Sequence, residues 1–323
     1  MKIGIIGATG HIDYAFAGLE AEDRIVGVAP GSDGESVEGL RQRPLIQAQQ
    51  PEFFDGAEAL FVKARPDVVA IACHFADHAR IAMAAMRHGI HVMLEKPVAL
   101  TLEDLGRLRE AHWQAQVHFT AMHALRYDSA FYAAWHAVRA GAIGEIRLMT
   151  AQKSYKLGRR PDYYTKRSTY GGTIPWVGSH AIDWLYWFSD QRARSVYAAH
   201  SILGNEGHGE LEATALCLFN FPNEVTGAAY IDYLRPATAP THGDDRLRVA
   251  GTRGRVAVRG GEAYLINDQA EGQQVLPKAP ARSIFGDFLA QIRGTGQCLI
   301  SPADAFAVTE ACLRARQSAD LDR

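Results

Sequence analysis

The chain has 323 residues, of which 47% are apolar and 22% are charged, and its formal net charge is −2. These values are typical of a globular protein with a sizeable core, and the length favours two domains. The small net charge argues against broad affinity for nucleic acids or anionic membranes, because both need concentrated positive charge on the protein.

The cysteines and the N-terminus indicate a soluble protein of the cytoplasm. Cys73, Cys217, Cys298 and Cys312 are far apart and form no CxxC pair, which suits a reduced compartment and offers no zinc cage. The N-terminal apolar stretch is too short and glycine-rich for a signal peptide. The most apolar longer region, 68–86, is interrupted by charged and imidazole side chains, so we expect no membrane span.

The first third of the chain alternates short apolar runs with helical patterns. We predict strands at 2–6, 24–28, 67–72 and 91–94, and helices at 11–19, up to 86 and at 102–111, with Thr101 capping Asp104. Almost continuously apolar strands that alternate with helices indicate a parallel sheet covered on both faces.

The stretch GIIGATG, residues 4–10, follows the first predicted strand and opens a predicted helix. Glycines in this place let the backbone approach a pyrophosphate, although the pattern is GxxGxxG and an ordinary strand–helix turn is the alternative. Asp13 stands where a small residue normally packs on the strand. The second strand runs into Pro30 and Ser32 without an acid to bind the ribose 2′-hydroxyl, and Asp33 is close. NAD and NADP both stay open.

The run VMLEKPV, residues 92–98, places Glu95, Lys96 and Pro97 at the carboxyl end of a predicted parallel strand. Ligands bind beyond such ends, so we expect Lys96 to project towards a nicotinamide and the substrate. An ammonium there can polarise a carbonyl or hydroxyl oxygen. A cis Lys96–Pro97 bond is compatible with the sequence. The alternative is a solvated ion pair at a strand end.

From about residue 123 the alternation gives way to a different order of elements. We predict helices at 129–140, 179–188, 284–293 and 302–318, and strands at 145–151, 193–201, 212–220, 225–233, 246–250, 256–259 and 263–266, with turns at 222–223 and 253–254. This order predicts an α+β domain with an open, mostly antiparallel sheet. The predicted domains are 1–122 and 123–323.

Several motifs together resemble the Gfo/Idh/MocA (glucose–fructose oxidoreductase/inositol dehydrogenase) family. They occur in order over nearly the whole chain: GIIGATG from residue 4, RPDVVAIAC from 65, HVMLEKPVALTLED from 91, AGAIGEI from 140, GGTIPWVGSHAIDWLYW from 171 and RLRVAGTRGRVAV from 246. The resemblance implies the α/β fold class, with an N-terminal Rossmann domain that binds NAD or NADP and a C-terminal domain that binds the substrate and forms oligomers.

The resemblance also implies a catalytic pair and its surroundings. Lys96 matches the family's catalytic lysine, and His180 matches the helix histidine that exchanges the substrate's hydroxyl proton. Asp183, one turn further on, would orient the imidazole or contact the substrate. Many members carry an aspartate where this chain has Trp176, which cannot accept a proton. Trp176 is either a stacking wall for a sugar-like ring or a core residue.

Further site residues follow from the same resemblance. Lys153 lies on a strand that would line the substrate side, and we expect Lys153 and Tyr155 to bind the substrate. Without the aspartate, either Lys96 and His180 suffice, or one of the tyrosines Tyr155, Tyr163, Tyr164 and Tyr170 takes part. His74 and His78 have the spacing of a helical metal pair, but without a third ligand we predict no metal site. The implied cofactor-binding residues are Gly7, Ala8, Thr9, Gly10, His11, Ile12, Ser32, Cys73, His74, His78, Glu95 and Lys96.

The sequence thus predicts an NAD(P)-dependent oxidoreductase that interconverts a hydroxyl and a carbonyl on a sugar, sugar acid or cyclitol. One alternative is a glycosidase that uses NAD for transient oxidation. The other is a non-catalytic dinucleotide-sensing protein, which Trp176 and Pro30 motivate. Apolar strands such as LEATALCLF, residues 211–219, predict that the second sheet is covered in a homodimer or homotetramer.

Overall fold

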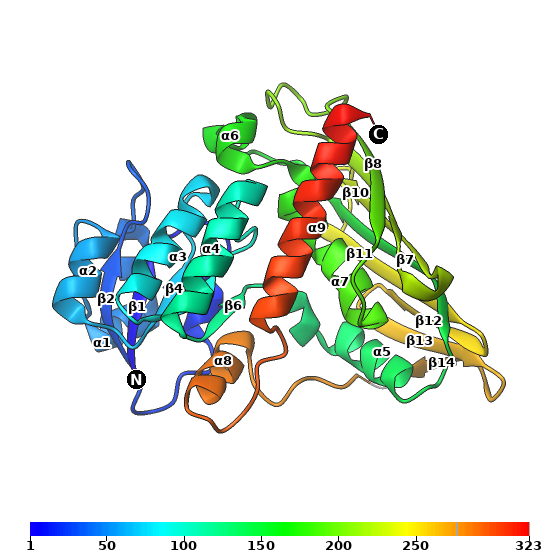
Figure 1. Ribbon diagram of the computed structural model, residues 1–323, viewed down its shortest axis with the longest axis horizontal. Coiled ribbons are helices and arrows are strands. Elements are labelled where there is room, and N and C mark those ends of the chain that lie inside the picture. Colours follow the sequence, from blue (N-terminus) through cyan, green and yellow to red (C-terminus); the bar gives the residue numbers. More distant parts are fainter. Residues whose placement is uncertain (276, 323) are drawn as a thin grey trace. The chain divides into compact units, whose positions relative to one another are not determined.

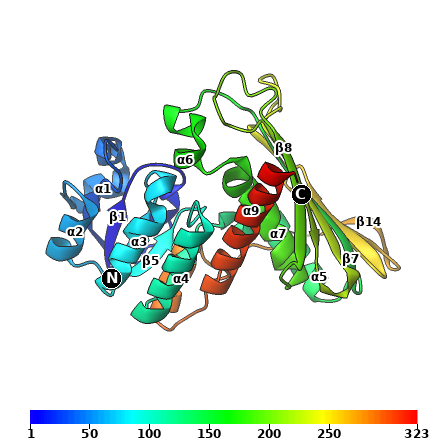
Figure 2. The same cartoon turned by 45° about the horizontal axis from the view of Figure 1, so that its top comes forward.

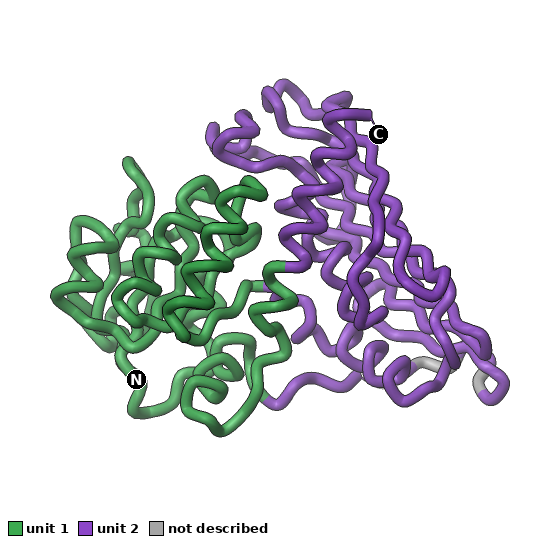
Figure 3. Tube along the Cα trace, viewed as in Figure 1, with its two compact units in different colours: residues 1–122, 282–306 green, residues 123–281, 307–323 purple. Residues whose placement is uncertain are grey.

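The computed structural model describes residues 1–275 and 277–322, and the chain forms two compact units (Figure 3). Unit 1 comprises Met1–Met122 and Arg282–Phe306, and unit 2 comprises His123–Ala281 and Ala307–Arg323. The segment Arg282–Phe306 therefore belongs with unit 1, whereas the sequence analysis assigned it to the second domain. The reason is packing, because the buried helix α8 (Ile284–Ile292) contacts strand β5 (His91–Leu94).

Unit 1 is built on a six-stranded sheet in the order β3-β2-β1-β4-β5-β6, in which all neighbouring strands are parallel (Figure 1). This is the strand order of a Rossmann dinucleotide-binding fold, as predicted. The strands other than β5 are β1 (Lys2–Ile6), β2 (Arg24–Ala29), β3 (Glu52–Phe53), β4 (Val68–Ile71) and β6 (Phe119–Ala121), and the helices are α1 (Pro44–Gln49), α2 (Ala57–Ala64), α3 (His78–Arg87) and α4 (Leu102–Ala115).

The central strands of unit 1 end at one level. Ile6 pairs with Ala29 of β2 and with Ile71 of β4, and Ile71 pairs with Leu94 of β5. The loops that follow these four strands therefore meet at the carboxyl edge of the sheet. The strand interiors are almost completely buried, which explains their continuous apolar sequence.

The helix predicted at 11–19 is wrong. The chain instead makes a short 3₁₀ turn, η1 (Ile12–Phe16). It cannot continue as an α-helix because Gly18 has a φ of +85° and a side chain there would collide with Ser283 and Gly286 of the α8 segment. Asp13 is exposed and forms an ion pair with Arg43 at 2.8 Å.

Unit 2 is built on an eight-stranded sheet in the order β14-β13-β12-β11-β7-β10-β9-β8. Only the pair β7–β10 is parallel, which confirms the open, mostly antiparallel sheet. The strands are β7 (Ile146–Tyr155), β8 (Ser195–Ser201), β9 (Thr214–Asn220), β10 (Thr226–Asp232), β11 (Gly243–Gly251), β12 (Gly254–Arg259), β13 (Glu262–Asn267) and β14 (Ala270–Val275).

The helices of unit 2 lie on one face of this sheet. Helices α5 (Ser129–Arg139), α7 (Ser179–Ser189) and the later part of α9 (Pro302–Leu321) stand on the same side in both views (Figure 1, Figure 2). Within the described chain no helix covers the other face, and strands β8, β9 and β10 expose Tyr197, Leu216, Leu218 and Tyr230 there. No helix among the described residues is both long enough and apolar enough to span a bilayer.

Candidate active site

The glycine loop after β1 is shaped by two left-handed residues. Gly7 and Gly10 have φ angles of +82° and +65°. A Cβ on Gly7 would lie 2.5 Å from the carbonyl oxygen of Ala72, and one on Gly10 would lie 2.7 Å from Glu95 Oε2. The Thr9 amide donates to the Ala72 oxygen at 2.8 Å, which fixes the loop against β4. Only glycine fits at these two places, so the loop brings bare backbone to the carboxyl edge of the sheet.

Glu95 connects this loop to β5. Its Oε2 accepts the His11 amide at 2.6 Å and faces His11 Nδ1 at 2.8 Å, and its Oε1 accepts the Lys96 amide at 2.8 Å. Burial by itself would raise the pKa of Glu95, but the charge and hydrogen bond of His11, with the charge of Lys96, lower it to about 2. The carboxylate is fully buried and bound by the chain itself. Glu95 therefore braces the loop, in place of the cofactor contact expected from sequence.

Lys96 follows Glu95 at the end of β5, and its peptide bond to Pro97 is cis. The Lys96 side chain is buried within unit 1. The next residue, Pro97, is held by His78, whose Nδ1 lies 2.8 Å from the Pro97 carbonyl oxygen. The other ring nitrogen, Nε2, lies 3.1 Å from the Cys73 carbonyl oxygen. His78 thus ties the Lys96–Pro97 segment to the end of β4.

His78 and Cys73 differ from their predicted roles as cofactor contacts. Both side chains are fully buried in unit 1. Burial lowers the pKa of the His78 imidazole and raises the pKa of the Cys73 thiol. The imidazole is therefore held neutral as a brace for Pro97, and the thiol is an inert core group.

The loop after β2 forms the second part of this edge. The His74 amide donates to Ser32 Oγ at 3.1 Å, which joins the ends of β2 and β4. A cavity of about 250 Å³ opens beside Ser32, between the loop 30–33, the loop 55–59 and Arg80 of α3. The glycine cradle, the strand order and this cavity fit the pyrophosphate and adenosine of a dinucleotide.

In unit 2, His180 is the second residue of α7. It follows a π-turn, η6 (Ile174–Gly178), a distortion that is frequent at functional sites. Gly178 lets this helix start lie close to β10, since a Cβ there would lie 2.5 Å from Ile231 Cδ1. The His180 ring meets the His123 ring edge-on, with centroids 6.2 Å apart. Trp176 is buried inside the turn, which favours the packing role that the sequence left open.

Lys153 of β7 is paired across the sheet. Its Nζ lies 2.6 Å from Asp245 Oδ2 on β11, at directly opposed register positions, and 4.6 Å from the centre of the Tyr155 ring. Burial lowers the pKa of Lys153, while the charge of Asp245 opposes that shift. Tyr155 and Asp245 line a cavity of about 1010 Å³ in unit 2. Sequence reasoning missed Asp245, because only strand register brings it to Lys153.

Asp183 is occupied by a partner that the sequence did not suggest. Arg126 donates from Nε to both carboxylate oxygens at 3.0 and 3.1 Å and from Nη2 at 2.6 Å. Both side chains are almost completely buried. This bidentate pair joins η4 (Ala124–Tyr127) to α7, so the structure favours an anchoring role for Asp183 in place of the predicted substrate contact.

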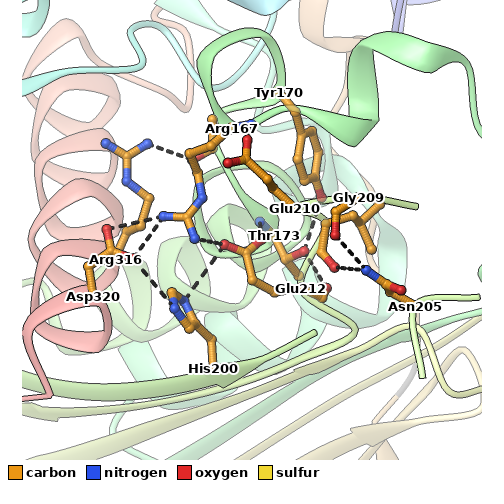
Figure 4. A network of polar contacts seen from close by, with 12 residues as sticks. Arg167, Tyr170, Thr173, His200, Asn205, Gly209, Glu210, Glu212, Arg316 and Asp320 are labelled. Atoms are coloured by element: carbon orange, nitrogen blue, oxygen red, sulfur yellow. Dashed lines mark hydrogen bonds and ion pairs between the residues drawn. The ribbon is translucent and has the colours of Figure 1, made fainter. Parts of the chain in front are cut away.

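A charged network fixes the segment that leads to η6 (Figure 4). Glu212 is buried, accepts the Thr173 amide at 2.9 Å and pairs with Arg167. Arg167 also pairs with Asp320 at 2.8 Å, and Arg316 donates to the Gly171 oxygen at 2.5 Å. The network ties the end of α9 to the start of the turn that carries His180 into place.

The described structure divides the predicted site residues between the two units. The glycine loop, Ser32, His74, Glu95 and Lys96 belong to unit 1, and Lys153, Tyr155, Trp176, His180 and Asp183 belong to unit 2. Unit 1 thus has the features of a dinucleotide site, while unit 2 carries an imidazole, a paired lysine and a large cavity.

Two family models match this chain. A model described as an oxidoreductase family with an NAD-binding Rossmann fold matches residues 1–123, and one described as the Gfo/Idh/MocA C-terminal domain matches residues 131–257. Among solved structures, a Thermotoga maritima protein designated an oxidoreductase is 45% identical, with a TM-score of 0.96, and the match covers 100% of this chain and 99% of that one.

Curated relatives match at lower identity. A 1,5-anhydro-D-fructose reductase of Ensifer adhaerens is 30% identical over 250 residues, which are 72% of each chain. A glycosyl hydrolase family 109 protein of Akkermansia muciniphila is 26% identical over 183 residues, which are 51% of this chain and 39% of the relative. The chain thus spans well under half of the length of that glycosidase.

Proposed function

Because the chain belongs to the Gfo/Idh/MocA family of NAD-binding oxidoreductases, we propose that it interconverts a hydroxyl and a carbonyl on a sugar, sugar acid or cyclitol. The observation that carries the proposal is the placement of Lys96, which is fixed at the carboxyl edge of the sheet beside the glycine loop by Glu95 and His78. The division of labour follows the two units, with the dinucleotide bound by unit 1 and the substrate by unit 2.

The chain's own groups would carry the proton and the oxygen charge. The dinucleotide supplies the hydride acceptor, or the donor in the reverse direction. In oxidation, His180 takes the hydroxyl proton as the carbon–oxygen bond becomes a carbonyl. Lys96 stabilises negative charge on that oxygen. We assign Lys153 and Tyr155 to substrate binding, since Asp245, the partner of Lys153, lines the same cavity as Tyr155.

A second candidate is a glycosidase that oxidises its substrate transiently, and the likeness to the glycosyl hydrolase family 109 protein supports it. Such an enzyme keeps its NAD through each turnover, because the hydride returns to the same molecule. The third candidate is a dinucleotide sensor, which Trp176 and Pro30 motivate, because Trp176 leaves no proton-accepting carboxylate at its position.

The unpartnered face of the unit 2 sheet supports a homodimer or homotetramer. The four cysteines are all free thiols and buried, which suits the reduced cytoplasm. We therefore place the proposed enzyme in the cytoplasm as a homo-oligomer.

The dinucleotide content of the purified protein is the test. Denatured supernatant is assayed for NAD and NADP, and the intact protein is then titrated with NADH and NADPH before a screen of polyols. A freely exchanging dinucleotide with polyol-dependent NADH formation is expected. Stoichiometric NAD that does not exchange would favour the glycosidase, and binding of neither dinucleotide would refute the proposal.

A further inference from the structure

Glu35, in the turn after β2, receives four hydrogen bonds on its carboxylate. Oε1 accepts the Ala8 amide at 3.1 Å and the Thr9 hydroxyl at 3.0 Å, both from the glycine loop. Oε2 accepts the amides of Gly31 at 2.9 Å and Ser32 at 3.3 Å, both from the end of β2. The carboxylate thus bridges the ends of the two strands on which a Rossmann fold holds the adenosine half of its cofactor.

This arrangement accounts for a missing residue. Rossmann domains that bind NAD usually carry an acid at the end of the second strand, where this chain has Pro30, Gly31 and Ser32. Glu35 lies further along the turn and reaches back to that edge, and its side chain is only partly exposed. Spacing along the sequence points instead to Asp33, which is exposed.

We propose that Glu35 makes this chain select NAD over NADP, because its carboxylate occupies the donors that a ribose 2′-phosphate would need. The inference rests on the proposed function. A second anion at this edge would find the amides and the hydroxyl already used, and it would be repelled by the carboxylate charge.

The neighbouring cation does not offset this repulsion. Arg80 lines the adjacent cavity, but its guanidinium donates to Asp77 at 2.6 and 3.0 Å and to the Gly31 oxygen at 3.2 Å. Its charge is thus paired with a carboxylate of its own helix start. The edge keeps a net acidic character, which suits two ribose hydroxyls and disfavours a phosphate.

Binding titrations of wild type, Glu35→Ala and Glu35→Gln with NADH and NADPH test the inference. Wild type is expected to bind NADH more tightly than NADPH by about tenfold or more, and both variants should shift the affinity ratio towards NADPH by about tenfold. Glu38→Gln is the matched control, since it removes one charge at an exposed position three residues after Glu35 that does not line the cavity, and its ratio should stay within about twofold of wild type.

A second variant tests the donors themselves. In the Glu35→Ala background, Thr9→Val removes the hydroxyl that Glu35 had occupied, so part of the gained NADPH affinity should be lost. Circular dichroism and thermal melting establish that each variant is folded, and Glu35→Gln keeps the side-chain length if the alanine variant is unstable.

The possible outcomes separate the inference from the proposed function. Unchanged ratios in folded Glu35 variants, a wild-type preference for NADPH, or an equal shift in Glu38→Gln would each overturn the role of Glu35 while leaving an oxidoreductase. A wild type that binds neither dinucleotide would instead refute the proposed function.

Discussion

At the scale of single residues, the motif Glu95-Lys96-Pro97 combines a structural carboxylate, Glu95, with the proposed catalytic ammonium of Lys96. Glu95 is ionised and buried because the His11 and Lys96 amides bind it, and His78 holds the carbonyl oxygen of Pro97. Lys96 is the member of the motif whose ammonium the proposed reaction uses. A solvated ion pair at a strand end would contribute little to stability by itself. We therefore explain the motif by the glycine loop that Glu95 holds in place.

Replacing either proposed catalytic residue should slow the reaction without loss of cofactor. Lys96→Ala and His180→Ala are each expected to lower kcat by about a hundredfold or more, because each removes proton transfer or charge stabilisation from the transition state. The measurement is steady-state kinetics on the best polyol, with NADH binding determined in parallel. Lys63→Ala, at an exposed position of α2, is the control. Near-normal turnover in both variants would contradict the assignment.

Glu95 should make unit 1 sensitive to acid. Its pKa is about 2 in the fold and about 4.3 in an unfolded chain, so the ionised form stabilises the fold above pH 4.3, on the order of 3 kcal/mol. That contribution is lost as the pH falls from about 4.3 towards 2.

Glu95→Gln should therefore destabilise the protein at pH 7, and the gap to wild type should shrink at pH 3. Urea unfolding at both pH values measures this gap, with the exposed Glu52→Gln as control. A gap of equal size at both pH values would show that ionisation is not the cause.

At the scale of elements, two short distorted turns decide where functional groups lie. The turn η1 replaces the expected helix because α8 packs against Gly18, and the π-turn η6 sets the start of α7. Each is stabilised by residues far away in the chain, since Glu212 and Arg316 hold the segment before η6 (Figure 4).

Glu212→Gln should weaken this anchoring of unit 2. The half-buried Arg167 would lose its pairing with the buried carboxylate and keep only Asp320, so we expect a loss of about 2–4 kcal/mol in unfolding free energy. Thermal and urea unfolding of the full chain measure it, with the exposed Glu206→Gln in the neighbouring loop as control. A change no larger than that of the control would mean that the network contributes little.

At the scale of the whole molecule, the sheet of unit 2 has one face that no described helix covers. Leu218 pairs across strands with Tyr197, and Leu216 pairs with Tyr230, so four large apolar side chains form one patch. Each is between 41% and 50% exposed, although alternate residues of the same strands are buried. A patch of this kind on a regular sheet is typical of an interface.

Charges placed on that patch should separate the proposed oligomer. Leu218→Glu combined with Tyr230→Glu is expected to give monomers at micromolar concentration, because desolvating two carboxylates outweighs the apolar contact. Light scattering after size exclusion measures the mass. Val62→Glu, on an exposed apolar residue of α2, is the control. A monomeric wild type would refute the interface.

Sequence patterns were enough to predict most helices, the motif residues Gly7, Lys96 and His180, and the strands of both sheets except β3, β6 and β14. They could do so because hydrophobic period, glycine placement and capping are local properties, and Thr101 indeed accepts the Asp104 amide at 3.0 Å. Cross-strand register decided that Asp245 meets Lys153, and turn geometry brought Glu35 to the glycine loop.

Sequence patterns did not show which charged side chains are bound by other residues of the chain and so have a structural role. That depends on tertiary contacts. Glu95 and Asp183 were predicted as ligand contacts, but His11 and Arg126 bind them from distant segments of the chain. The sequence likewise did not predict that residues 282–306 belong to unit 1, because this depends on the surface that α8 buries. Such pairings join residues far apart in the chain, and their energy depends on burial and distance, which a linear pattern does not contain.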